Sequence, residues 1–220
     1  MTVAQKLAKL GAGLTLVVAV TALSGAPAAH ADTLPSDACS ASFDHGDKRL
    51  GPEQLPTTGP VGHELVGYQR TGGASDSAFL AQYWDPTAWN GAGGWHYPPQ
   101  NGYLLLPNGK PAEIKERLAP GQDIDRFGSE YGSFLAPEGL PYASRAIPPQ
   151  SLDGQPPAAC NYHDYRVLKT FEVDAGPIAP WFNQPGLGWQ YQLDATLVPG
   201  GPTQLNVLWL VNNGYLERLI

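Results

Sequence analysis

Two stretches of the sequence decide the fold: DRFGSEYGSFL, residues 125–135, and GPIAPWFNQPGLGWQ, residues 176–190. Each joins aromatic side chains to glycine or proline, the residues that set tight turns. The first stretch carries the guanidinium of Arg126, and the second ends on the amide of Gln190. We therefore expect short strands and turns in both, each with one polar group that is a candidate for a functional site.

Periodicity predicts that these stretches belong to a sheet. In residues 189–193, Trp189, Tyr191 and Leu193 would lie on one face of a strand and Gln190 on the other. Further strands are expected at residues 102–106, 112–118, 123–127, 166–173 and 215–220. The 26 glycines and 22 prolines disfavour long helices, while six Trp, ten Tyr and six Phe can fill a core. The predicted class is α+β: a mixed or antiparallel twisted sheet with few short helices and a small N-terminal extension.

Three local signals are more specific. Ser75 is a candidate N-cap for a short helix that would run to Trp84. The pair Asn108-Gly109 has the composition of a type I′ hairpin turn. Residues 205–212 suit either a helix or a strand.

The first 31 residues have the pattern of a secretory signal peptide. Lys6 and Lys9 precede an apolar stretch at residues 10–23, and Ala29-His30-Ala31 supplies the small residues of a cleavage site. A membrane anchor is the alternative, but Gly, Thr, Ser and Pro interrupt the apolar stretch. We therefore expect residues 1–31 to be removed and the mature protein to be secreted, with no membrane contact afterwards.

A glycine-rich stretch at residues 90–94, Asn-Gly-Ala-Gly-Gly, is interpreted as a flexible joint. We place a domain boundary there. It separates an N-terminal extension at residues 32–94 from a larger domain at residues 95–220.

Charge and cysteine content narrow the possible partners. The net charge of −7 becomes −9 once Lys6 and Lys9 are removed with the leader, which makes nucleic acid an unfavourable partner. Two cysteines in an exported chain predict one disulfide, Cys39–Cys160. A zinc site is not expected, because the nearby histidines lack metal-ligand spacing.

Each candidate site residue allows two interpretations. Arg126 could form a surface ion pair with Asp125, or its planar guanidinium could bind a pyrophosphate, and Arg145 allows the same two roles. Gln190, an amide between aromatic residues, is either an edge residue or an inward-pointing site group. The remaining candidates could belong to the core or surface, or could contact a ligand: Phe127, Tyr131, Phe134, His163 and Trp181.

Taken together, ordered blocks from Trp95 onward resemble the TNT domain, the NAD⁺ glycohydrolase fold named after tuberculosis necrotizing toxin. The matching blocks lie at residues 95–103, 118–121, 125–142, 145–149, 162–167 and 176–190. The segment Arg49-Leu50-Gly51-Pro52 is similar to part of the thumb-like extension of the secreted fungal members. The resemblance implies that residues 95–220 are the catalytic domain and residues 32–94 the thumb-like extension.

The resemblance also implies an activity, hydrolysis of the nicotinamide–ribose bond of NAD⁺, with NADP⁺ as a further candidate substrate. Gln190, Arg126 and Arg145 would be catalytic. Substrate binding would fall to Phe127, Tyr131, Phe134, His163 and Trp181. No cofactor is implied. The fungal members carry a calcium site toward an extended C-terminus, which the sequence after Tyr215 does not suit, so no metal is expected. A homodimer is implied by the same fungal members.

The implied chemistry suits a chain without a visible catalytic acid. Nicotinamide leaves NAD⁺ as a neutral base, so it needs no proton from the protein. Two other functions stay open. An ADP-ribosyltransferase would usually carry a Glu-x-Glu element, which the sequence lacks. A non-catalytic extracellular interaction module would have no reason to keep Arg126, Arg145 and Gln190 together.

Overall fold

A computed structural model describes residues 36–220, which belong to one compact unit. The predicted signal peptide, residues 1–31, lies outside the described residues. Within the described part of the chain, no helix has the length and apolar character needed to cross a membrane.

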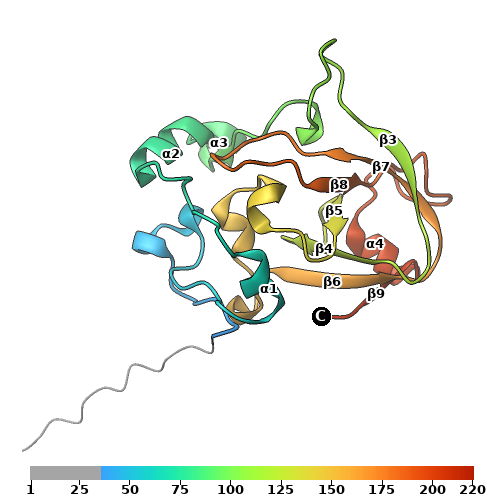
Figure 1. Ribbon diagram of the computed structural model, residues 1–220, viewed down its shortest axis with the longest axis horizontal. Coiled ribbons are helices and arrows are strands. Elements are labelled where there is room, and N and C mark those ends of the chain that lie inside the picture. Colours follow the sequence, from blue (N-terminus) through green and yellow to red (C-terminus); the bar gives the residue numbers. More distant parts are fainter. Residues whose placement is uncertain (1–35) are drawn as a thin grey trace, which may run out of the picture. The chain divides into compact units, whose positions relative to one another are not determined.

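A seven-stranded sheet organises the fold (Figure 1). Its order is β3-β7-β8-β5-β4-β6-β9, and every neighbouring pair is antiparallel. The strands are β3 (Ile114–Leu118), β4 (Asp123–Phe127), β5 (Phe134–Pro137), β6 (Tyr162–Val167), β7 (Phe171–Pro177), β8 (Trp189–Gln192) and β9 (Leu216–Arg218). The predicted α+β class with an antiparallel sheet is confirmed.

The helices of the described chain are short, and one of them shows the expected cap. They are α1 (Gly59–Glu64), α2 (Asp76–Tyr83), α3 (Ala88–Gly91) and α4 (Val207–Asn212). Single turns of 3₁₀ helix occur at η1 (Asp44–Gly46), η2 (Lys48–Leu50), η3 (Gln100–Gly102), η4 (Tyr142–Arg145), η5 (Pro149–Leu152) and η6 (Pro157–Ala159). Ser75 caps α2 by accepting a hydrogen bond from the Ala78 amide, as predicted. Asn206 caps α4 in the same way through the Trp209 amide at 2.9 Å, which favours the helix over the strand.

The predicted strand at residues 166–173 is wrong. β6 ends at Val167 and β7 begins at Phe171, with an exposed Leu168 between them. β6 pairs with β4 and β9, whereas β7 pairs with β3 and β8, so the chain must cross the sheet between the two strands. Val167 and Phe171 both reach the core, which is why the alternation continues through the break.

The turn at Asn108-Gly109 is also of a different type from the one predicted. The Gly109 amide donates to the Leu106 carbonyl at 2.8 Å, and Gly109 has φ +76°. Asn108 has no positive φ, whereas a type I′ turn needs positive φ at both central residues. Only the glycine is therefore left-handed in this turn.

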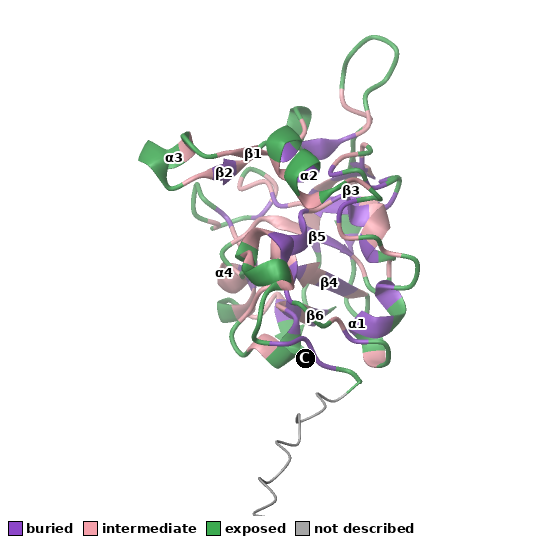
Figure 2. Ribbon diagram, turned by 90° about the vertical axis from the view of Figure 1, so that its left-hand side faces the viewer, coloured by how far each residue is buried: buried purple, intermediate pink, exposed green. Residues whose placement is uncertain are grey.

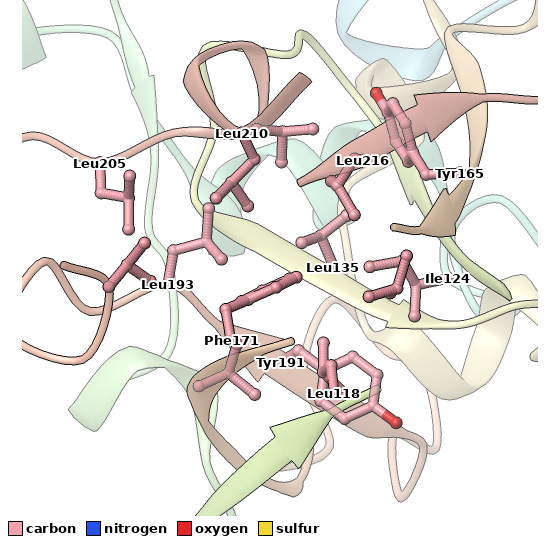
Figure 3. Packing of buried hydrophobic residues seen from close by; sticks show 14 of the residues in the cluster. Leu118, Ile124, Leu135, Tyr165, Phe171, Tyr191, Leu193, Leu205, Leu210 and Leu216 are labelled. Carbon is pink, nitrogen blue, oxygen red and sulfur yellow. The ribbon is translucent and has the colours of Figure 1, made fainter. Parts of the chain in front are cut away.

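The main core lies on one face of the sheet, where α4 packs against it. Figure 3 shows part of it, in which Ile124 of β4, Leu135 of β5 and Tyr191 of β8 lie in one cluster with Leu210 of α4 and Leu216 of β9. Alternation along β4 and β8 then directs Asp125, Phe127 and Gln190 to the opposite face. Figure 2 shows that buried residues follow the strands and α1, whereas α3 is exposed.

Residues before Trp95 pack directly on the larger part of the chain. The predicted disulfide Cys39–Cys160 is present and lies in a cluster with Val61, Leu65 and Phe127. The glycine-rich stretch at residues 90–94 follows β1 (Trp84–Asp85) and leads into β2 (Gly94–Trp95), and these two short strands pair. The boundary near residue 94 stays a prediction.

Candidate active site

A cavity of about 490 Å³ gathers most of the predicted site residues. Its wall includes five of them: Arg126, Phe127, Phe134, Arg145 and Gln190. Segment 97–102 and residues 146–151 complete much of the lining. A small hollow of about 60 Å³ shares these five residues and also touches Asp125. The five residues come from β4, β5, β8 and the turn η4, so the antiparallel register of the sheet brings them together.

Gln190 points inward and is not an edge residue, while its role in a functional site stays a prediction. It lies opposite Gly176 in the β7–β8 pairing, in the interior of the sheet, and is only 8% exposed. Its Nε2 donates to the carbonyl of Asn101 at 3.0 Å. The amide nitrogen is therefore used to hold segment 97–102.

Arg126 is held by backbone carbonyls and not by an acid. Its Nε donates to Ser129 O at 2.8 Å and its Nη1 to Phe134 O at 2.7 Å. Within residues 36–220 it forms no ion pair with a carboxylate, so the interpretation as an Asp125–Arg126 pair is wrong. Burial lowers its pKa, but an arginine stays charged at neutral pH. The result is a fixed guanidinium that no carboxylate of residues 36–220 neutralises and whose Nη2 has no hydrogen-bond partner among those residues.

Arg145 is in a different state, because two acidic side chains surround it. Its guanidinium donates to both oxygens of Asp125 and, at 2.8 Å, to Oε2 of Glu64 from α1. It also lies 5.1 Å from the centre of the Phe127 ring. Asp125 is fully buried, and Arg145 and Glu64 are nearly so. Arg145 therefore supports the cavity wall with most of its donors already occupied.

Glu64 carries the strongest pKa perturbation of this group. Burial raises its pKa to about 8, since the single charge on Arg145 is already matched by Asp125. Nothing in the sequence around Glu64 singled it out, because it lies in a helix of six residues far from the two diagnostic stretches. Glu64 does not line the cavity itself; it is a contact from the N-terminal segment to the wall residue Arg145 that only the tertiary structure reveals.

Three predicted binding residues lie elsewhere. Tyr131 and His163 line a second cavity, of about 480 Å³, which shares no lining residue with the first. Burial lowers the pKa of His163. Trp181 lines neither cavity; its Nε1 donates to His96 O at 2.6 Å, and its ring packs edge-on against Tyr83. Whether these three residues contact a ligand stays a prediction.

Potential metal ligands cluster away from the cavity. Within residues 36–220, Asp44, His45 and Asp76 bring three ligand atoms together, and His45 Nδ1 lies 2.6 Å from Asp76 Oδ2. Hydrogen bonding to Asp76 raises the pKa of His45, so the pair is satisfied as it stands. None of the three residues lines the 490 Å³ cavity.

Comparison with known proteins identifies the family. The family described as tuberculosis necrotizing toxin (TNT) matches residues 117–219. The conidial surface nicotinamide adenine dinucleotide glycohydrolase nadA of Aspergillus fumigatus is 45% identical over 177 residues, which cover 79% of this chain and 70% of the fungal protein.

Two solved structures are more distant. Tuberculosis necrotizing toxin complexed with its immunity factor IFT is 19% identical, with 66% of this chain and 71% of that chain covered at a TM-score of 0.45. Tse6 in complex with Tsi6 is 16% identical, with coverage of 49% and 72% at a TM-score of 0.30. The sequence match to the fungal protein carries the assignment, and the chain belongs to the TNT-domain family.

Proposed function

We infer that this protein is an NAD⁺ glycohydrolase, which cleaves the bond between nicotinamide and ribose. The observation that carries this inference is the 45% identity, over 79% of the chain, to a protein described as a nicotinamide adenine dinucleotide glycohydrolase. The cavity adds chemical support, since it combines a fixed cation, aromatic side chains and an inward-facing amide.

Arg126 is the group best suited to the pyrophosphate of NAD⁺. Its two backbone acceptors fix the guanidinium plane, and the unused Nη2 can donate to phosphate oxygens. Because no carboxylate of the described residues neutralises it, its charge is available to an anionic substrate. Phe134, beside it on β5, offers apolar surface to a flat ring.

Gln190 is assigned to the reacting ribose. With Nε2 engaged by Asn101, its Oε1 is the atom left to accept a hydrogen bond from a ribose hydroxyl or from the attacking water. A fixed amide dipole of this kind stabilises positive charge that develops on the ribose as nicotinamide departs. The residue is therefore proposed to act on the transition state more than on binding.

The described lining residues of the cavity include no carboxylate. Asp125 lines the 60 Å³ hollow and accepts hydrogen bonds from Arg145. Its oxygens also accept hydrogen bonds from the Gly139 amide and the Tyr162 hydroxyl. General acid catalysis is not needed, because nicotinamide leaves as a neutral base. We propose that Arg145 serves the site by fixing this wall and the Phe127 ring.

A product assay tests the activity and its alternatives. The mature protein is incubated with NAD⁺, and free nicotinamide, ADP-ribose and labelled protein are measured; a parallel reaction contains NADP⁺. We expect nicotinamide and ADP-ribose in equal amounts. Transfer of label to protein would instead support an ADP-ribosyltransferase, and no turnover of either dinucleotide would support a non-catalytic module.

We also propose that the protein is secreted and forms a homodimer. The fungal relative is described as a conidial surface protein, and a Cys39–Cys160 disulfide forms in oxidising compartments. Detection of the mature chain in culture medium tests the location. Sedimentation of the purified protein tests the dimer, and a monomer at micromolar concentration would refute it.

A further inference from the structure

Tyr97 is a wall residue of the 490 Å³ cavity to which no role has been assigned. Its side chain is 60% exposed. Yet the surrounding protein shields the hydroxyl enough to raise its pKa. Tyr97 thus has protein near its hydroxyl while most of its surface is open to solvent. This is the environment of a residue that lines a cavity and not of a core residue.

The backbone on both sides of Tyr97 is firmly held. Before it, the His96 amide donates to Tyr83 O at 2.8 Å, and the His96 carbonyl accepts from Trp181 Nε1 at 2.6 Å. The Tyr97 ring itself meets Phe182 edge-on, with 5.7 Å between the ring centres. Trp181 therefore contributes to the site by fixing the backbone next to Tyr97.

The segment after Tyr97 is also restrained. Pro98 and Pro99 restrict the chain, and the Asn101 carbonyl is bound by the Gln190 amide at 3.0 Å. Gln100 and Asn101 both have positive φ, a conformation that non-glycine residues adopt only when their surroundings impose it. A wall fixed in this way loses little entropy when a ligand binds to it.

We propose that Tyr97 is a substrate-binding residue that stacks on one flat heterocycle of NAD⁺. The proposal rests on the proposed function. NAD⁺ carries a ring at each end of its pyrophosphate, and Arg126, which forms no ion pair within residues 36–220, belongs to the wall of the cavity that Tyr97 lines. With the pyrophosphate bound to Arg126, at least one ring must lie along the cavity wall, where an exposed aromatic face offers stacking.

Two rings of NAD⁺ share this chemistry. The nicotinamide ring is cationic and would gain a cation–π attraction to the electron-rich Tyr97 face. The adenine ring would stack on Tyr97 without a cation–π attraction, because it carries no positive charge. Product inhibition distinguishes the two, because nicotinamide and ADP-ribose each carry one of the rings.

Three variants provide the test in NAD⁺ turnover assays. Tyr97→Leu keeps apolar contact with Phe182 but removes the aromatic face, and we expect it to raise KM by about 10-fold with a smaller change in kcat. Tyr97→Phe keeps the face and should stay within about 2-fold of wild type. Trp89→Ala is the control, since Trp89 is 81% exposed and does not line the cavity.

The KM values and the product inhibition of these variants decide whether Tyr97 stacks on a ring of NAD⁺. An unchanged KM in Tyr97→Leu overturns the proposal, and so does an equal loss in Tyr97→Phe, which would point to the hydroxyl. A weaker inhibition by either nicotinamide or ADP-ribose supports it and identifies the ring, whereas unchanged inhibition by both contradicts it. If the wild-type protein does not turn NAD⁺ over, the proposed function fails, and NAD⁺ binding measured by calorimetry on the same variants still tests Tyr97.

Discussion

Replacing Gly132 by alanine tests the role of Arg126 without removing its charge. A β-carbon at Gly132 would lie 2.7 Å from Arg126 Nη1 and closer still to Nη2 and Cζ. Carbon and nitrogen atoms in contact are about 3.5 Å apart, so the guanidinium must move by about 1 Å or more. Gly132 does not have a left-handed φ, and alanine therefore fits its backbone.

Such a shift would break the geometry that holds Arg126. Its hydrogen bonds to Ser129 O and Phe134 O, at 2.8 and 2.7 Å, cannot both survive the displacement. A misplacement of this size costs about 100-fold in rate in a well-aligned site. We therefore expect kcat/KM for NAD⁺ to fall by about 100-fold, or about 2.7 kcal/mol, mainly through KM.

A double-mutant cycle makes the test specific. The measured quantity is kcat/KM for NAD⁺, determined at high enzyme concentration. Gly132→Ala is compared with wild type, and the double variant Gly132→Ala/Arg126→Ala is compared with Arg126→Ala. We expect the added methyl to have little effect once Arg126 is gone. Gly201→Ala is the matched control, because Gly201 also lacks a left-handed φ and lines none of the three cavities of about 470–490 Å³. Full activity in a folded Gly132→Ala protein, or an equal loss in both backgrounds, would refute the reasoning.

Three further changes have defined outcomes. Gln190→Ala should lower kcat by about 100-fold or more in a protein that remains folded, because the amide acts on the transition state; near wild-type turnover would remove it from the site. Glu64 keeps its proton in the folded state up to pH of about 8 but loses it near pH 4.5 when unfolded, so stability should fall between these values. Glu64→Gln should flatten that fall, and parallel Tm curves against pH would contradict this. Cys39→Ser should lower Tm, as should reducing agent on the wild type, since the disulfide closes a loop spanning 121 positions and contributes about 4–5 kcal/mol in the chain-entropy account. A Tm indifferent to reductant would falsify that expectation.

Local patterns were sufficient for much of the fold. The strand at Asp123–Phe127 and the helix capped by Ser75 follow from alternation and capping, which depend on neighbours along the chain. The disulfide followed from cysteine count and export. The prediction of one strand at residues 166–173 was wrong. Alternation of apolar and polar residues does not reveal the point at which one strand ends and the next begins to pair with other strands.

The two diagnostic stretches were sufficient to nominate Arg126, Phe134 and Gln190, which the structure brings to one cavity. The hydrogen-bond and ion-pair partners of each residue were decided by the tertiary structure. Asp125 and Arg126 are adjacent in sequence, yet their partners differ: Asp125 binds Arg145, whereas Arg126 donates to the Ser129 and Phe134 carbonyls and forms no ion pair within residues 36–220.

Long-range contacts decided the rest of the site. Glu64 lies 81 positions from Arg145, and Asn101 lies 89 positions from Gln190. The sequence by itself determined which residue types and local elements exist. Their pairing across the sheet and onto the N-terminal segment depends on register and packing, which no local pattern encodes, and that pairing alone decides which charges are neutralised and which remain for a substrate.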